Sequence, residues 1–508
     1  MNEIQKKANK KEKNLKLNII FNGLYQFFVL IVPFITSPYV SRVLLPTGVG
    51  SYSVALSWVT YFSTFAAFGF LEYGTMILAK HRNNRKESSQ LFYEIIFGKC
   101  VFTLIIFALY VILVLSNVFS SPSYPQNSKL VYLLLGFNIL VNAFDASFLF
   151  QGFEEFGKLC LRNFIVRLLN MILIFVLVRN SNDYISYIAI MGGSNILLGL
   201  FSFIGIHKNV DKPKWSNPHL FHHLKEAFIY FIPTASIIFF PIISKTFISL
   251  FVRDAIQSGY YEQADKLITL IVTMINSVDA IMMSRMSYLY AIGDKKQIKE
   301  KTKKSLKFYL LLALPAFFGV LIINPYFTTG FFGAKYQESV NLVYFLSAKV
   351  LFAPLTALLG AIYYIPSGQI GKRNIFYLIG LGLNILLNFL LTYFKGTAGA
   401  SIASTLTEFV LVIIFVMFAK KNIHLFSLTK ETFVRVLDGA LLMFISCYFA
   451  TSFLKNRTSN IIVSILTILM GIVIYIIFLL LSKEETITFY FKLYIRKVKI
   501  SLSKLKKH

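Results

Sequence analysis

Seven ionisable side chains lie deep inside apolar stretches of this sequence. Five are basic and two are acidic: Lys99, Arg167, Lys245, Lys266 and Lys349, against Asp145 and Glu408. A charge in such surroundings costs several kcal/mol unless it faces water or a partner, so each is a candidate functional residue. Because ammonium and guanidinium groups bind phosphates, the basic excess predicts a binding site for an anion.

Three more candidates lie close to these residues or nearer to the ends of the apolar stretches. Arg42 and Arg285 are near such ends, where a long side chain can extend to the polar boundary. Asp265 is adjacent to Lys266 and can neutralise part of the basic excess. Ion pairs that hold helices together are the alternative interpretation of all these charges.

The elements that position these residues must be membrane-spanning helices. Of the 508 residues, 56% are hydrophobic and only 15% are charged, and the mean hydropathy is +0.65. This composition excludes a soluble domain. Continuously apolar runs such as 461–481 are long enough to cross a hydrocarbon core of ~30 Å as helices. The sequence therefore predicts an all-α integral membrane protein.

About fourteen transmembrane helices are expected, near 17–44, 50–79, 90–117, 129–153, 158–179, 184–206, 225–251, 259–289, 305–326, 338–364, 373–394, 397–419, 431–453 and 460–482. They divide the chain into a basic N-terminus (1–16), an N-lobe of six helices (17–206), a linker (207–224), a C-lobe of six helices (225–419), two additional helices (420–482) and a basic amphipathic tail (483–508).

Lysine and arginine predict the orientation of these helices. Most of the 51 basic residues fall in the termini and in alternate connectors, on one face of the membrane. The positive-inside rule then makes both termini, the linker and the tail cytoplasmic. The net charge of +28 follows from this topology, and no basic folded domain for nucleic acid is expected.

Cysteine and histidine give no sign of a metal site. The three cysteines are far apart in apolar stretches, where packing roles are expected. Three histidines gather in HLFHHLK (219–225), but acidic or cysteine partners are missing nearby. A solvated amphipathic turn is therefore favoured over a metal centre.

A weak internal repeat recurs with an offset of about 210 residues. GSYSVA (50–55) aligns with GYYEQA (259–264), and the prolines of the first helix in each half, Pro33 and Pro38, correspond to Pro233 and Pro241. Two halves of six helices each are typical of a carrier that works by alternating access. The four prolines are candidates for bending those helices, against the alternative of harmless kinks.

Two N-terminal stretches are PYVSRVLLPTGVGSYSVALSWVTYF (38–62) and GFLEYGTMILAKHRNN (69–84). They resemble the start of bacterial polysaccharide repeat-unit flippases of the O-antigen and capsule type, and the likeness spans nearly the whole chain in helix number and lobe organisation. These flippases belong to the multidrug, oligosaccharidyl-lipid and polysaccharide exporter superfamily. GYYEQADKLITL (259–270) is similar to the eighth helix of the related lipid II flippases, which implies that Lys266 lines a central cavity. Those flippases carry more arginines in the first helix than the single Arg42 here.

The resemblance implies a carrier that moves an undecaprenyl-diphosphate-linked oligosaccharide across the bacterial cytoplasmic membrane, without enzymatic chemistry. Membrane lipids and this cargo are the expected partners, a polysaccharide polymerase is a candidate partner, and a monomer is expected. A cation or drug antiporter of the same superfamily is the first alternative. A membrane-bound polymerase or ligase is the second, although the predicted outward connectors are too short for a catalytic domain.

No cofactor is expected, and the energy source stays open. The sequence contains no G-x-x-x-x-G-K-[ST] loop for ATP. Asp145, Glu408 and Asp265 are candidates for coupling to H+ or Na+. The membrane potential is the other candidate, at ~2.3 kcal/mol per charge and 100 mV.

Overall fold

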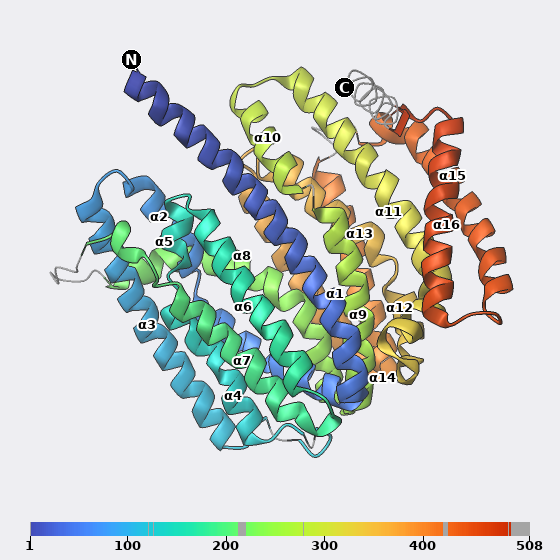
Figure 1. Ribbon diagram of the computed structural model, residues 1–508, viewed down its shortest axis with the longest axis horizontal. Coiled ribbons are helices and arrows are strands. Elements are labelled where there is room, and N and C mark those ends of the chain that lie inside the picture. The colour runs from blue at the N-terminus through green and yellow to red at the C-terminus, as the bar shows by residue number, and fades with distance from the viewer. Residues whose placement is uncertain are drawn as a thin grey trace, which may run out of the picture. The chain divides into compact units, whose positions relative to one another are not determined.

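The computed structural model describes residues 2–119, 121–124, 126–211, 220–277, 279–419, 425–485 and 487–488. In these ranges the chain folds into helices and contains no β-strand (Figure 1). It divides into two compact units, Met1–Glu262 and Gln263–His508. The division falls inside one helix, α9 (Ala255–Asn276). The lobe boundaries given above stay a prediction, and the tail beyond residue 488 lies outside the described residues.

The first unit is built from helices that follow the apolar runs of the sequence. They are α1 (Asn2–Ala67), α2 (Phe70–His81), α3 (Arg85–Leu115), α4 (Lys129–Phe144), α5 (Ser147–Gly152), α6 (Phe156–Leu177), α7 (Tyr184–Phe201) and α8 (Leu220–Phe247), with short turns η1 (Ser181–Asp183), η2 (Ile206–Lys208) and η3 (Ile248–Val252). Its core lies where α1, α3, α4, α6 and α7 pack together, around buried side chains such as Leu44, Val59, Leu135 and Ile188.

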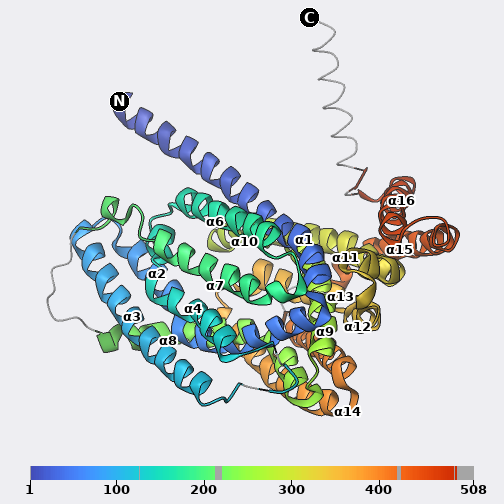
Figure 2. The same cartoon turned by 60° about the horizontal axis from the view of Figure 1, so that its bottom comes forward.

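The second unit begins within α9. It contains α10 (Asp279–Ala291), α11 (Lys295–Phe332), η4 (Ala334–Tyr336), α12 (Ser339–Leu346), α13 (Lys349–Leu359), η5 (Gly360–Tyr364), α14 (Ile370–Ala419), α15 (Leu425–Leu454) and α16 (Asn460–Leu481). Helices α15 and α16 lie side by side and both pack on α11 (Figure 2). Leu311, Val436 and Leu479 form part of this core, and Tyr475 donates a hydrogen bond to the carbonyl of Leu311 at 3.0 Å.

Two of the long helices are interrupted where the sequence demands a turn. In α1 the backbone leaves helical geometry at Leu45, with φ 61°, directly before Pro46, because proline disfavours the helical region for the residue that precedes it. In α14 the break is at Gly396, with φ 57°, a conformation that suits glycine. Each of these long helices therefore accounts for two of the predicted spans.

Every one of the fourteen predicted ranges overlaps a helix of the structure. By length and composition, nine helices of the described residues are apolar enough to span a membrane, or ten if the bent pair Ser339–Leu346 and Lys349–Tyr364 counts as one span. The all-α membrane fold is confirmed, and the number fourteen stays a prediction. Large apolar side chains remain exposed along these helices, as expected of surfaces that contact lipid.

The four prolines proposed to bend the first helix of each half lie inside helices. Pro33 and Pro38 are in α1, and Pro233 and Pro241 are in α8. Bending at these positions stays a prediction.

Candidate functional site

Three of the deep lysines lie beside carboxylates. The first is Lys349, at the start of α13, whose Nζ lies 2.9 Å from Oδ1 of Asp265 on α9. Both side chains are buried. Glu408 of α14 is close enough to interact electrostatically with both. This site in the second unit therefore contains one base and two acids, which is one acid more than a balanced pair needs.

The second lysine, Lys245, lies in the last turn of α8. Its Nζ is 2.6 Å from Oε2 of Glu262 on α9, and the hydroxyl of Ser53 in α1 donates a hydrogen bond to the same carboxylate oxygen. Sequence reasoning missed Glu262 as a site residue. A signal was available, because Glu262 lies one helical turn before Asp265 and Lys266.

The third lysine stabilises a break between two helices. Lys99 of α3 is 2% exposed, and its Nζ donates a hydrogen bond to the backbone carbonyl of Asp145 at 2.7 Å. The carboxylate of Asp145 is further away, at 3.9 Å, and accepts a hydrogen bond from the backbone N–H of Ser147. Because α4 ends at Phe144 and α5 begins at Ser147, Lys99 satisfies a carbonyl that the helix leaves without a partner.

The remaining basic candidates are more accessible. Arg167 is half-buried near the middle of α6, and no ion pair or hydrogen bond joins its side chain to any residue that the structure describes. Lys266 is half-buried on α9, about 100° around the helix from Asp265. Arg42 and Arg285 are exposed, and the guanidinium of Arg285 lies over the ring of Tyr288.

The two segments paired by the sequence repeat meet each other. A Cβ atom on Gly50 would lie 2.5 Å from the backbone nitrogen of Gly259, and one on Gly259 would lie 2.1 Å from the carbonyl oxygen of Pro46. The alignment also pairs Ser53 with Glu262, and these two side chains are hydrogen-bonded. Contacts between equivalent residues are the mark of a local two-fold axis. Only glycine permits so close an approach of the two backbones.

A buried polar cluster joins α2, α3 and α8. His223 is buried, its Nε2 lies 2.8 Å from Oε2 of Glu94 and its Nδ1 lies 2.8 Å from the hydroxyl of Tyr73. The expected solvated turn is therefore wrong at His223, because the carboxylate that it meets comes from a distant part of the chain. His222 is exposed, and His219 lies outside the described residues. No cluster suited to a metal occurs among the described residues.

His223→Ala is expected to destabilise the protein by about 1–3 kcal/mol, because it leaves the buried Glu94 carboxylate without one of its hydrogen-bond donors. The measurement is the thermal unfolding midpoint of the purified protein in detergent. His222→Ala is the matched control and should have little effect. Equal shifts in the two variants would contradict a role for the buried cluster.

The comparison with known families identifies the chain. The model of a family described as polysaccharide biosynthesis protein matches residues 15–284, which is more than half of the sequence. The chain belongs to this polysaccharide biosynthesis family. The predicted relation to polysaccharide exporters is confirmed, and this member of the family is a multi-pass membrane transporter, not an enzyme.

Two proteins described as O-antigen transporters are similar to most of the chain. A protein of Escherichia coli (strain K12) described as an O-antigen transporter is 24% identical over 418 residues, which is 82% of this chain and 99% of that protein. A protein of Shigella dysenteriae with the same description is 23% identical over 419 residues, covering 81% of this chain and 100% of its own.

Solved structures share the fold of this family member. The lipid II flippase MurJ in an inward closed conformation has a TM-score of 0.74 and 18% identity, covering 91% of this chain and 98% of its own. An inward-facing multidrug resistance transporter of the MATE family, from the MOP superfamily, has a TM-score of 0.57 and 13% identity, covering 79% of this chain and 99% of its own.

Proposed function

We propose that this protein flips undecaprenyl-diphosphate-linked oligosaccharide repeat units across the bacterial cytoplasmic membrane, by alternating access, for the synthesis of surface polysaccharide. The observation that carries the proposal is the match, over more than four fifths of the chain, to proteins described as O-antigen transporters. The fold shared with a lipid II flippase supports it, since it is a scaffold that suits movement of a lipid with a large polar headgroup.

The physical task explains the buried lysines. A headgroup with sugars and two phosphates cannot enter hydrocarbon without losing its hydration. Ammonium groups can replace that hydration with charge-assisted hydrogen bonds. Asp265 neutralises Lys349, and Glu262 neutralises Lys245. A diphosphate can take the place of the carboxylate as the partner of each lysine.

Proton uptake can drive this exchange. The site around Lys349 contains two carboxylates for one ammonium, so we take the acid in excess, Glu408, as the candidate for proton uptake. Protonation weakens the hold of the acids on Lys349 and makes the lysine available to the cargo. Asp145 is a weaker candidate for coupling, because Ser147 and Lys99 already bind it. Arg167 and Lys266 provide further positive charge at half-buried positions.

Depletion of the protein tests the proposal. Lipid-linked oligosaccharide is expected to accumulate in the inner leaflet of the cytoplasmic membrane, where an impermeant lectin added from outside to spheroplasts does not reach it. Re-expression of the wild-type chain should remove the accumulation. Accumulation in the outer leaflet would instead indicate a polymerase or ligase, and no accumulation in either leaflet would favour an antiporter of small cations. The predicted monomer and the polymerase partner are further parts of the proposal.

A further inference from the structure

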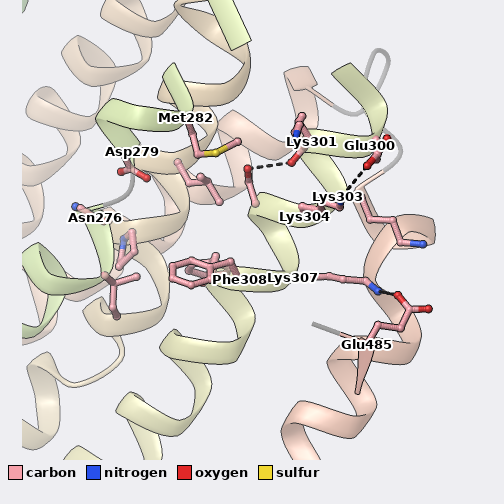
Figure 3. Close-up of a pocket in the computed structure, with 15 residues that line it drawn as sticks. Asn276, Asp279, Met282, Glu300, Lys301, Lys303, Lys304, Lys307, Phe308 and Glu485 are labelled. Carbon is pink, nitrogen blue, oxygen red and sulfur yellow. Dashed lines mark hydrogen bonds and ion pairs between the residues drawn. The ribbon is translucent and has the colours of Figure 1, made fainter. Parts of the chain in front are cut away.

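A pocket of about 630 Å³ lies in the second unit, apart from the deep ion pairs (Figure 3). Its walls come from the end of α9, from α10, from the first turns of α11 and from α13, and Glu485 closes one side. The α11 wall lies where the sequence changes from the charged run KKQIKEKTKK (295–304) to the apolar run that follows. By the positive-inside rule, this depth corresponds to the headgroup layer of the cytoplasmic leaflet.

Four lysines of α11 line the pocket: Lys301, Lys303, Lys304 and Lys307. Two of them are neutralised, because Lys304 lies 2.7 Å from Glu300 and Lys307 lies 2.7 Å from Glu485. Lys307 also holds the pKa of Glu485 below its usual range, so that this carboxylate is charged at neutral pH.

The other two lysines leave positive charge available. The ammonium groups of Lys301 and Lys303 form no hydrogen bond or ion pair with any residue in the described part of the chain. Asp279 also lines the pocket, but at the end away from Lys303, Lys304 and Lys307 (Figure 3). An anion is therefore expected at the lysine end.

The rest of the lining is mostly apolar. Met282, Phe308, Pro354 and Leu358 supply carbon surface next to the charged rim. A free phosphate ion would contact only the charged rim, and the apolar surface would stay in contact with water. A molecule that carries a phosphate on one end and hydrocarbon on the other uses both parts.

We propose that this pocket binds an anionic phospholipid of the cytoplasmic leaflet, with the phosphate held by Lys303 and Lys307, which lie about one helical turn apart on the same face of α11, and the glycerol and first methylene groups against Phe308 and Met282. The proposal does not depend on the flippase function, because the pocket shares no residue with the deep ion pairs.

Native mass spectrometry of the purified full chain tests this site. Wild-type protein is expected to retain phosphatidylglycerol in preference to phosphatidylcholine. The variant Lys303→Gln should bind phosphatidylglycerol about tenfold more weakly, since a charge-assisted contact is lost. Lys86→Gln removes the same charge from an exposed lysine of the first unit and should bind as wild type. Unchanged binding in the first variant, or equal losses in both, would overturn the proposal.

Two further measurements distinguish a bound phospholipid from a free phosphate ion. Millimolar inorganic phosphate should not displace the lipid, and displacement would mean a site for a free anion. A photoreactive phosphatidylglycerol on wild-type protein should crosslink to peptides that contain residues 301–309 or 279–282. This measurement does not depend on the folding of any variant. Crosslinks confined to other helices, or competition by a polyprenyl diphosphate and not by phosphatidylglycerol, would also overturn the proposal.

Discussion

Lys349→Met is expected to abolish surface polysaccharide and to lower the amount of protein in the membrane. Removing one member of a buried ion pair leaves the other charge uncompensated, which costs about 3–5 kcal/mol. Here Asp265 is the charged residue that loses its partner, and Glu408 lies close by. Surface polysaccharide is measured by immunoblot, and protein in the membrane fraction by a tag on the chain.

A second variant distinguishes a structural role of Lys349 from a role in transport. Lys349→Met/Asp265→Asn removes both charges of the pair and should restore much of the protein level. Transport should remain absent, because the partner proposed for the diphosphate is still missing. Recovery of polysaccharide in the double variant would make Lys349 a structural residue only. Arg82→Met/Glu154→Gln removes an exposed pair and should change neither quantity, since such pairs contribute about 1 kcal/mol or less.

Gly50→Ala and Gly259→Ala are each expected to eliminate transport. A Cβ on Gly50 would lie 1.8 Å from the carbonyl oxygen of Ala255, and one on Gly259 would lie 2.1 Å from that of Pro46. The obstacle in both cases is backbone, so α1 and α9 must move apart. We expect a destabilisation beyond the about 1–3 kcal/mol usual for overpacking. The measurements are polysaccharide export and the thermal midpoint of the purified protein.

Glycines at which an added Cβ atom has open space around it serve as the controls for these two variants. A Cβ on Gly193 in α7 or on Gly382 in α14 meets nothing within 4 Å. Alanine at these positions should leave both export and stability close to wild type. A normal Gly50→Ala or Gly259→Ala variant would show that the two backbones do not need to approach this closely during transport.

The sequence could predict the helices because hydrophobic length and breaking residues are local properties. Pro46 and Gly396 lie between neighbouring predicted spans, and the helices of the structure are interrupted at or next to these residues. Depth was predictable as well, since counting residues from the ends of an apolar run gives the position of a lysine along its helix. Lys99 and Lys349 are accordingly buried.

The partners of these lysines could not be predicted in the same way. Depth says nothing about which side of a helix a residue occupies, nor which helix lies opposite. Lys349 meets a residue 84 positions away and His223 meets one 129 positions away. Only packing brings such residues together. The two acids that sequence reasoning missed, Glu262 and Glu94, lie on different helices from the side chains that they contact, Lys245 and His223.

The contact between Gly50 and Gly259 has a consequence for the history of the chain. If the halves descend from one ancestral gene whose product paired with itself, a single ancestral glycine touched its own copy across the symmetry axis. A change there would have altered both sides at once. Fusion into one polypeptide would release that constraint for neighbouring positions, and in this chain a hydroxyl at position 53 faces a carboxylate at position 262.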